Sequence, residues 1–175
     1  MEDALAIEAR RRIYDLLLAS PGIYFRELQR ELDAPTGALE YHLNYLEAKG
    51  LILASKGKGH TRYFVKESLS QREREVMGAL RNKNDRAVLM HLLVNPRSGY
   101  DEIMEKCGMP RTSVAESVSR MTEMRLVEEG RDERRNVYSV AENEQENAAK
   151  LLIAYKESFI DRTVDRFIKL WKEMK

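Results

Sequence analysis

The chain of 175 residues is long enough for one medium-sized domain or two small ones, and its 43% hydrophobic and 34% charged residues are typical of a soluble globular protein. The formal net charge of +1 excludes a strong global attraction for polyanions, so any nucleic-acid binding must depend on local charge. No run of about 18 apolar residues predicts a membrane span. A single cysteine, Cys107, excludes an intramolecular disulfide framework, and the acidic, amphipathic N-terminus is unlike a signal peptide, which predicts a cytoplasmic protein.

The first half of the chain predicts three helices and a hairpin. The first helix covers residues 4–19, with Leu5, Ile13, Leu16 and Leu17 on its apolar side, and Ser20-Pro21-Gly22 ends it. A second helix follows with Leu28 and Leu32 inward. The third begins near residue 36 and ends at Gly50, which is suited to the position after a helix C-terminus. Two strands, 51–55 and 62–65, then flank a turn at 56–60.

The third helix has two different faces. Leu39, Leu43 and Leu46 recur at i, i+4 and i+7, which predicts one buried side. The opposite side carries residues of a face that could hydrogen-bond to base edges or phosphates in a DNA major groove: Thr36, Gly37, Glu40, Tyr41 and Asn44.

The second half repeats the first without a gap when the numbering is shifted by 75. Apolar positions align throughout, for example Leu17 with Leu92 and Leu43 with Val118, and Pro21 and Pro35 align with Pro96 and Pro110. The sequence therefore predicts two copies of one small domain in tandem.

The predicted division of the chain is a first domain at 1–67, a connecting helix at 68–83, a second domain at 84–141 and a C-terminal segment at 142–175. Asn82 to Asp85 should form a turn and the N-cap of the next helix. The C-terminal segment contains no Pro or Gly from Glu142 to Met174, and its apolar spacing suits one long helix or a helix pair. The fold class is mainly α with short β-hairpins, namely tandem winged helix-turn-helix domains and a long C-terminal helix.

The motif P-T-G-A-L-E-Y-H-L-N-Y-L-E-A-K-G-L-I, followed by a basic hairpin that ends R-Y-F, resembles archaeal and bacterial winged-helix transcriptional regulators, above all the ArsR-like group and its archaeal relatives. The second copy, P-R-T-S-V-A-E-S-V-S-R-M-T-E-M-R-L-V, is similar but less typical. The resemblance covers most of residues 10–66 and 85–140. It implies a three-helix core with a β-hairpin wing, and usually a dimer on a pseudo-palindromic operator.

Carried over by motif position, the resemblance implies that the wing lies against phosphate or the minor groove. It also implies that six residues of the third helix face the groove, namely Thr36, Gly37, Ala38, Glu40, Tyr41 and Asn44. The wing residues are Lys56, Lys58, His60 and Arg62. In the second copy the matching residues are Arg111, Thr112, Ser113, Glu116, Ser117 and Arg120, with a wing around Arg131, Arg134 and Arg135. Metal-sensing members carry a Cys-x-Cys type cluster that this sequence lacks, so neither metal nor cofactor is expected.

Charge distinguishes the two wings. Residues 55–66 contain Lys56, Lys58, Arg62 and Lys66 and no acid, an arrangement suited to neutralising phosphates and releasing counterions. In residues 128–135 the acids Glu128, Glu129, Asp132 and Glu133 outnumber the arginines by one. We expect the first domain to be the stronger DNA reader, whereas the second either grips phosphate or mainly shapes the dimer.

Several residues have an ordinary structural interpretation beside the functional one. A solvated hairpin is the alternative for the wing charges. His42 is expected to pack against the core, and Cys107 aligns with the inward Leu32, so it is expected to be a small buried hydrophobe. The C-terminal segment could fold back on its own domain, but we expect dimerisation through Leu152, Tyr155, Phe159, Phe167 and Trp171, since it follows a domain already complete without it.

The sequence contains no phosphate-binding glycine loop, nucleophile elbow or HExxH motif, so an enzyme is not expected. The prediction is a dimeric, sequence-specific regulator that binds double-stranded DNA. The alternative is a tandem winged-helix scaffold that binds proteins, as in chromosome-organising or trafficking assemblies. The near-neutral charge and the acidic second wing favour the scaffold, and the basic first wing opposes it.

Overall fold

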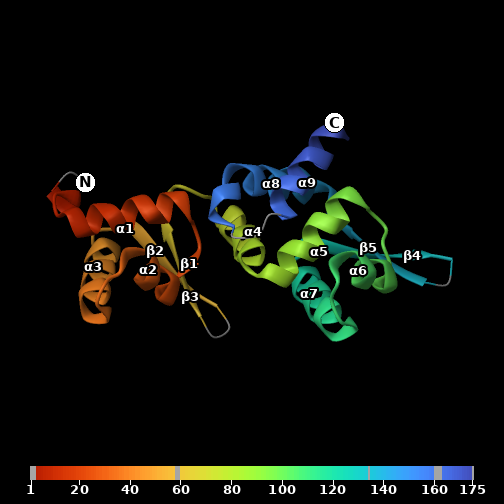
Figure 1. Ribbon diagram of the computed structural model, residues 1–175, viewed down its shortest axis with the longest axis horizontal. Helices are drawn as coiled ribbons and strands as arrows, with labels where there is room; N and C mark the ends of the chain where they lie inside the picture. Colours follow the sequence, from red (N-terminus) through yellow and green to blue (C-terminus); the bar gives the residue numbers. More distant parts are fainter. Residues whose placement is uncertain (1–2, 58–59, 134, 160–162, 175) are drawn as a thin grey trace. The chain divides into compact units, whose positions relative to one another are not determined.

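The computed structural model describes residues 3–57, 60–133, 135–159 and 163–174. The chain divides into two compact units, residues 1–74 and 75–175, and Figure 1 labels the helices and strands of both. The finer division into four segments, with limits at 67, 83 and 141, stays a prediction.

The first unit packs helices against a small antiparallel sheet. Its elements are the 3-10 helix η1 (Asp3–Leu5), α1 (Glu8–Ala19), β1 (Ile23–Tyr24), α2 (Phe25–Leu32), α3 (Thr36–Ala48), β2 (Ile52–Lys56) and β3 (Thr61–Val65). β3 is the central strand, in the order β1-β3-β2, and Ile23 pairs with Tyr63 while Ile52 pairs with Val65. The strands thus fall where the apolar runs predicted them.

Helical spacing of apolar residues forms the core of this unit. Every helix contributes leucine or isoleucine from one side, and β1, β2 and β3 add their inward residues; the core residues are Ile13, Leu17, Ile23, Leu28, Leu39, Leu43, Leu46, Ile52 and Val65. All are at most 5% exposed. Burial of this size stabilises by about 1.5–3 kcal/mol for each large aliphatic side chain, before the loss of conformational entropy is counted.

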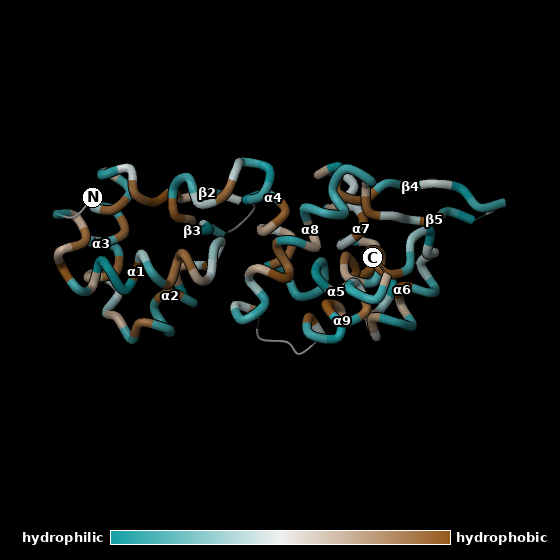
Figure 2. Tube along the Cα trace, turned by 90° about the horizontal axis from the view of Figure 1, so that it is seen from above, coloured by the Kyte–Doolittle hydropathy of each residue, from teal (hydrophilic) through white to brown (hydrophobic). Residues whose placement is uncertain are grey.

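The second unit repeats this architecture and adds helices. It contains most of α4 (Gln71–Arg81), then α5 (Lys83–Val94), α6 (Tyr100–Cys107), α7 (Arg111–Glu123), β4 (Val127–Asp132), β5 (Arg135–Val140), α8 (Glu142–Ala154), the 3-10 helix η2 (Lys156–Ser158) and α9 (Thr163–Glu173). The predicted N-cap of α5 is confirmed, because Asn82 Oδ1 accepts hydrogen bonds from the backbone N–H groups of Asn84 and Asp85. The distal part of the β4–β5 hairpin is hydrophilic (Figure 2).

The tandem repeat is confirmed at the level of single elements. The helices α1, α2 and α3 begin at residues 8, 25 and 36, and α5, α6 and α7 begin at 83, 100 and 111. The pairing of Ile23 with Tyr63 recurs as a bridge between Ser98 and Tyr138. Even the left-handed backbone positions recur, since Gly50 has φ 68° and Arg125, which is 75 residues later, has φ 55°.

Of the two alternatives for the C-terminal segment, the helix pair is confirmed and the single long helix is wrong. α8 ends at Ala154, and Phe159 then has an extended backbone. The break lets both segments bury an apolar side within the unit, because α9 packs against α5 and α8. Arg81 helps to hold the break, since its Nη1 donates a hydrogen bond of 2.9 Å to the Ser158 carbonyl.

Candidate nucleic-acid interface

One side of α3 meets the core of the first unit, and the other side is open. Leu39, Leu43 and Leu46 are at most 2% exposed, whereas Tyr41 is 61% exposed. All six residues predicted to face a groove are exposed: Thr36, Gly37, Ala38, Glu40, Tyr41 and Asn44. Thr36 is tied to α2, because its Oγ1 accepts a hydrogen bond of 2.9 Å from Gln29 Nε2. The open side of α3 is therefore a mixed polar and aromatic surface on a helix, the element that fits a major groove.

A cation–π contact fixes α3 to α1. The guanidinium carbon of Arg10 lies 3.5 Å from the centroid of the Tyr45 ring, and Arg10 is only 6% exposed. His42 lies close by, half-buried as expected, and its Nδ1 is buried without a partner in the described part of the chain. Burial and the charge of Arg10 lower the pKa of His42, so this side chain is neutral near pH 7. The contact holds the open face of α3 in place. Because the partner of Arg10 is a ring and not an acid, the contact adds no carboxylate to that face.

The β2–β3 hairpin holds its basic residues in two different ways. Lys56 is exposed at the end of β2. Arg62 instead turns to β1, since its Nη1 donates a hydrogen bond of 3.0 Å to the Gly22 carbonyl and its guanidinium carbon lies 4.2 Å from the Tyr24 ring centroid. His60 lies against the same ring, at 5.1 Å between centroids. Arg62 thus joins β1 to β3, and its expected contact with phosphate stays a prediction. Lys58 lies outside the described residues.

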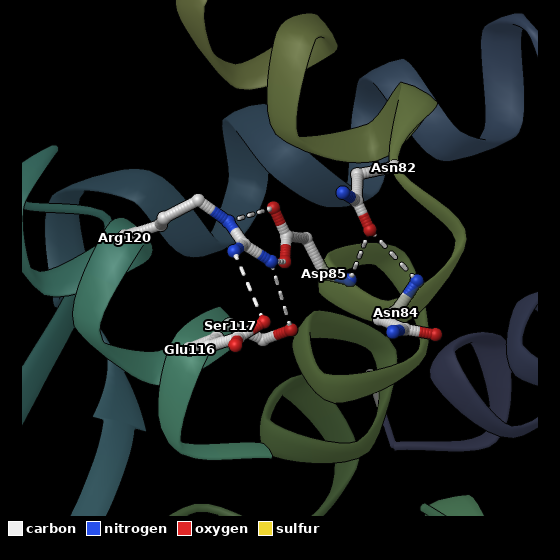
Figure 3. A network of polar contacts seen from close by, with 6 residues as sticks. All are labelled: Asn82, Asn84, Asp85, Glu116, Ser117 and Arg120. Atoms are coloured by element: carbon white, nitrogen blue, oxygen red, sulfur yellow. Dashed lines mark hydrogen bonds and ion pairs between the residues drawn. The ribbon is translucent and has the colours of Figure 1, made fainter. Parts of the chain in front are cut away.

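In the second unit, two of the residues predicted to face a groove lie in an internal network (Figure 3). Arg120 Nη2 donates to Asp85 Oδ1 at 2.6 Å, and its Nε donates to Asp85 Oδ2 at 3.2 Å. The same Nη2 lies 3.3 Å from the Oγ of Ser117, which is fully buried. The hydrogen bond to Asp85 raises the pKa of Arg120. The expectation that Ser117 and Arg120 face a groove is corrected, because Ser117 is buried and Arg120 joins α7 to α5.

The start of α7 is also engaged within the unit. Arg111 and Thr112 are exposed and Ser113 is half-buried. Arg111 Nη1 lies 3.5 Å from an Asp101 carboxylate oxygen, and its guanidinium carbon lies 5.2 Å from the Tyr100 ring centroid. Arg111 thus already has an acid and a ring as partners.

At the second wing, Arg135 of β5 and Arg97, which precedes α6, lie beside acids. Arg135 lies 3.3 Å from an Asp132 carboxylate oxygen and 3.9 Å from one of Glu102. Arg97 lies 3.8 Å from the other oxygen of Asp132 and donates to the Arg131 carbonyl at 3.1 Å. These ion pairs are exposed and individually weak, but together they leave the wing without a surplus of positive charge. Arg134 lies outside the described residues.

The residues expected to form a dimer surface lie mostly in the interior of the second unit. Leu152, Phe159, Phe167 and Trp171 are at most 8% exposed, and Tyr155 is half-buried. The Phe167 and Trp171 rings stack, with centroids 5.9 Å apart. Their expected role as exposed dimer anchors is wrong, because α8 and α9 cover the unit to which they belong, as the alternative had it.

Sequence reasoning missed the residues that hold α3 and α7 in place. The numbering shift of 75 aligns Arg10 with Asp85, and Tyr45 with Arg120. The same junction is therefore built from a cation and a ring in one unit and from an ion pair in the other. The aligned repeats contained a sign of this difference. Both positions change between the two copies, whereas the aligned apolar positions stay apolar.

In the part of the chain that the structure covers, no helix is both long and apolar enough to cross a membrane. The same residues contain no group of three or more His, Cys, Asp or Glu placed to hold a metal ion.

Comparison with known proteins gives a match for each unit. Residues 7–77 match a family model described as an N-terminal HTH domain, and residues 81–128 match one described as winged helix-turn-helix DNA-binding. The chain is also similar to the uncharacterized HTH-type transcriptional regulator MJ1398 of Methanocaldococcus jannaschii, with 26% identity over 81% of this chain and 36% of that protein. It thus spans about a third of the length of this curated relative.

A solved structure, that of the DIP2311 protein from Corynebacterium diphtheriae, aligns with 76% of this chain and 26% of its own at 18% identity, with a TM-score of 0.32. This likeness is too low to inform the fold. The two domain matches, the repeat of 75 residues and the hairpin after each third helix agree with one another. They show that the chain carries two helix-turn-helix domains in tandem, the second of which matches a winged helix-turn-helix DNA-binding domain.

Proposed function

We propose that the first unit reads double-stranded DNA by placing the exposed face of α3 in the major groove. The observation that supports the proposal is the contrast between the two faces of α3. The leucines on one face are buried, whereas on the opposite face Tyr41 is 61% exposed and Asn44 is also exposed. An amide such as that of Asn44 can bond bidentately to adenine, and a hydroxyl such as that of Thr36 can bond to base edges or phosphates. The Arg10–Tyr45 contact would preserve the angle at which this face is presented.

The β2–β3 hairpin would contact the phosphate backbone beside the groove. Lys56 is exposed, Lys58 and Lys66 add charge in the sequence around it, and residues 55–66 contain no acid. Each phosphate that a lysine neutralises releases counterions and makes binding weaker as salt rises. The role of Arg62 differs from that of the lysines, since it stabilises the hairpin on which they stand.

A salt series on random-sequence duplex DNA, followed by fluorescence anisotropy, tests the backbone contact. The variant K56A/K58A should bind all sequences more weakly, and its slope of log affinity against log salt should be shallower by about 0.9 for each phosphate that is no longer neutralised. The matched control K169A/K172A removes the same charge from exposed positions of α9 and should keep the parent slope. Equal slopes for the parent and K56A/K58A would refute the wing contact. A parent that binds no DNA at low salt would favour the scaffold alternative.

Selection of preferred sites tests the groove contact. Y41A and N44A should alter which bases are preferred, because a bidentate hydrogen-bond pair to a base is worth about 1–3 kcal/mol of discrimination at one position. The control S119A changes the residue of the second unit that aligns with Asn44, and it should leave the preference unchanged. If S119A alters the preference and N44A does not, the second unit is the reader.

We further propose that the protein acts as a homodimer on two half-sites roughly 34 Å apart, one helical turn, or a multiple of that. The predicted aromatic anchors are buried, so support moves to two exposed apolar residues at the C-terminal end of the chain. Leu170 of α9 is 39% exposed, and Met174, which directly follows α9, is 54% exposed. Sedimentation velocity should show a dimer for the parent and a monomer for L170E/M174E. The control L18E changes an exposed leucine of α1 and should remain dimeric. Dissociation by L18E alone would move the interface to α1.

A further inference from the structure

The second unit carries acids at positions where the first unit is neutral. On the side of the unit formed by the third helix and the hairpin, Tyr41, Ala48, Leu53 and Ala54 align under the shift of 75 with Glu116, Glu123, Glu128 and Glu129. All four glutamates are exposed. Since backbone and register agree between the units, these replacements alter charge without altering the fold.

Three arginines on that side already lie beside acids. Arg120 is held by Asp85, Arg111 by Asp101, and Arg135 by Asp132. A phosphate that approaches any of them would have to compete with a carboxylate already in place. The repulsion between phosphate and carboxylate is stronger at low salt, where it is less screened. This side of the second unit therefore suits a positively charged ligand.

A groove lies between α7 and the hairpin on the same side. It has a volume of about 350 Å³ and is lined by Tyr100, Val118, Ser119, Thr122, Glu123, Glu129 and Tyr138. The rings of Tyr100 and Tyr138 pack edge to face with centroids 5.0 Å apart, and Tyr138 is 4% exposed. The groove thus combines two aromatic rings with two carboxylates.

This combination matches the side chain of arginine or lysine. The apolar stem of such a side chain packs on aromatic and aliphatic surface while its charged end reaches a carboxylate. Glu129 is already oriented by a hydrogen bond from Asn136, so its carboxylate is fixed before a ligand arrives.

We propose that the helix and hairpin side of the second unit binds an extended segment of a partner protein that carries arginine or lysine, with one such side chain inserted between Tyr100, Glu123 and Glu129. The volume is at the lower end of the range of about 300–1,000 Å³ for small-molecule sites, which fits a single long side chain. The alternative of protein binding thus applies to the second unit. The inference is independent of the DNA sequence that the first unit reads, and it goes beyond the proposed function.

The test uses the full chain and a fluorescein-labelled nonapeptide, Gly-Ser-Arg-Ser-Arg-Ser-Arg-Ser-Gly, with anisotropy as the readout. A second peptide with glutamine in place of arginine shows whether charge is required. The variant E123Q/E129Q keeps the shape of both side chains and one acceptor oxygen on each, and it removes their charge. The control E105Q/E142Q removes the same charge from exposed positions of the second unit outside the groove.

The arginine peptide should bind and the glutamine peptide should not. E123Q/E129Q should weaken the binding of the arginine peptide about fivefold, as expected for two partly solvated charge pairs, while E105Q/E142Q should bind like the parent. S119W, which fills the groove and keeps its charge, should also weaken binding. Absence of peptide binding at low salt would overturn the proposal, as would equal weakening in E123Q/E129Q and the control. Random-sequence duplex that displaces the peptide from the K56A/K58A variant would assign the surface to DNA instead.

Discussion

Replacing Arg120 with methionine tests whether an ion pair fixes α7 to α5. Methionine keeps much of the apolar stem and removes the guanidinium group. The partner, Asp85, has a side chain only 6% exposed, and Arg120 reaches both of its carboxylate oxygens, at 2.6 and 3.2 Å. The substitution therefore leaves a nearly buried carboxylate without its cation.

The expected cost follows from burial. Removing one partner of a fully buried pair costs about 3–5 kcal/mol. Two features of this pair reduce that cost. The side chain of Arg120 is 43% exposed, so solvent screens its charge. Asp85 lies in the first turn of α5, where the helix dipole stabilises an acid by about 0.3–1 kcal/mol. We expect R120M to lower the free energy of unfolding of the second unit by about 2 kcal/mol.

The assay is urea unfolding followed by fluorescence of Trp171, which is the single tryptophan of the chain and is 8% exposed in the second unit. With a slope of about 1.5 kcal/mol per molar urea, the midpoint should fall by roughly 1.3 M. The control R111M removes an arginine whose partner Asp101 is 94% exposed, and it should cost less than about 0.5 kcal/mol.

The double variant D85N/R120M should recover part of the stability, because no uncompensated charge remains. If R120M costs no more than R111M, Arg120 does not hold α7 on α5. Arg120 would then be available for DNA, as the motif position implied.

Three further predictions concern backbone and ionisation. G50A should destabilise the first unit by about 1 kcal/mol, because the φ of 68° at Gly50 is strained for a residue with a side chain. G37A should stabilise the same unit by about 0.5–1 kcal/mol, since nothing lies within 4 Å of the added carbon. Thermal melts followed by far-ultraviolet circular dichroism would measure both changes, and a change of the same sign in both variants would contradict the reasoning. Burial lowers the pKa of His91, so the unfolded chain binds a proton before the folded chain does as the pH falls through about 6.5. The second unit should therefore be less stable at about pH 5.5 than at pH 7.5. In H91Q the loss of stability between these two pH values should be smaller. Burial raises the pKa of the Cys107 thiol to about 11, so alkylation by iodoacetamide near pH 8 should be far slower in the native protein than in urea, and equal rates would show an open thiol.

Local sequence determined the order and limits of most elements. The leucines of α3 recur with helical spacing, and burying them in one core leaves Tyr41 and Asn44 on the other side whatever the rest of the chain does. Gly50 ends that helix because the left-handed conformation required there is free of strain for glycine. The repeat was visible because apolar positions that pack one fold must recur in the same register.

Only the tertiary structure decided which polar side chains remain open to a ligand. Arg62 and Arg120 occupy positions that a motif assigns to DNA, yet their partners are the Gly22 carbonyl, 40 residues away, and the Asp85 carboxylate, 35 residues away. Phe167 and Trp171 had the spacing of an exposed interface, but a break after Ala154 turns them inward. The physical reason is that a charged or aromatic side chain is stabilised by whichever partner the fold brings within contact, and such partners are far away in the sequence.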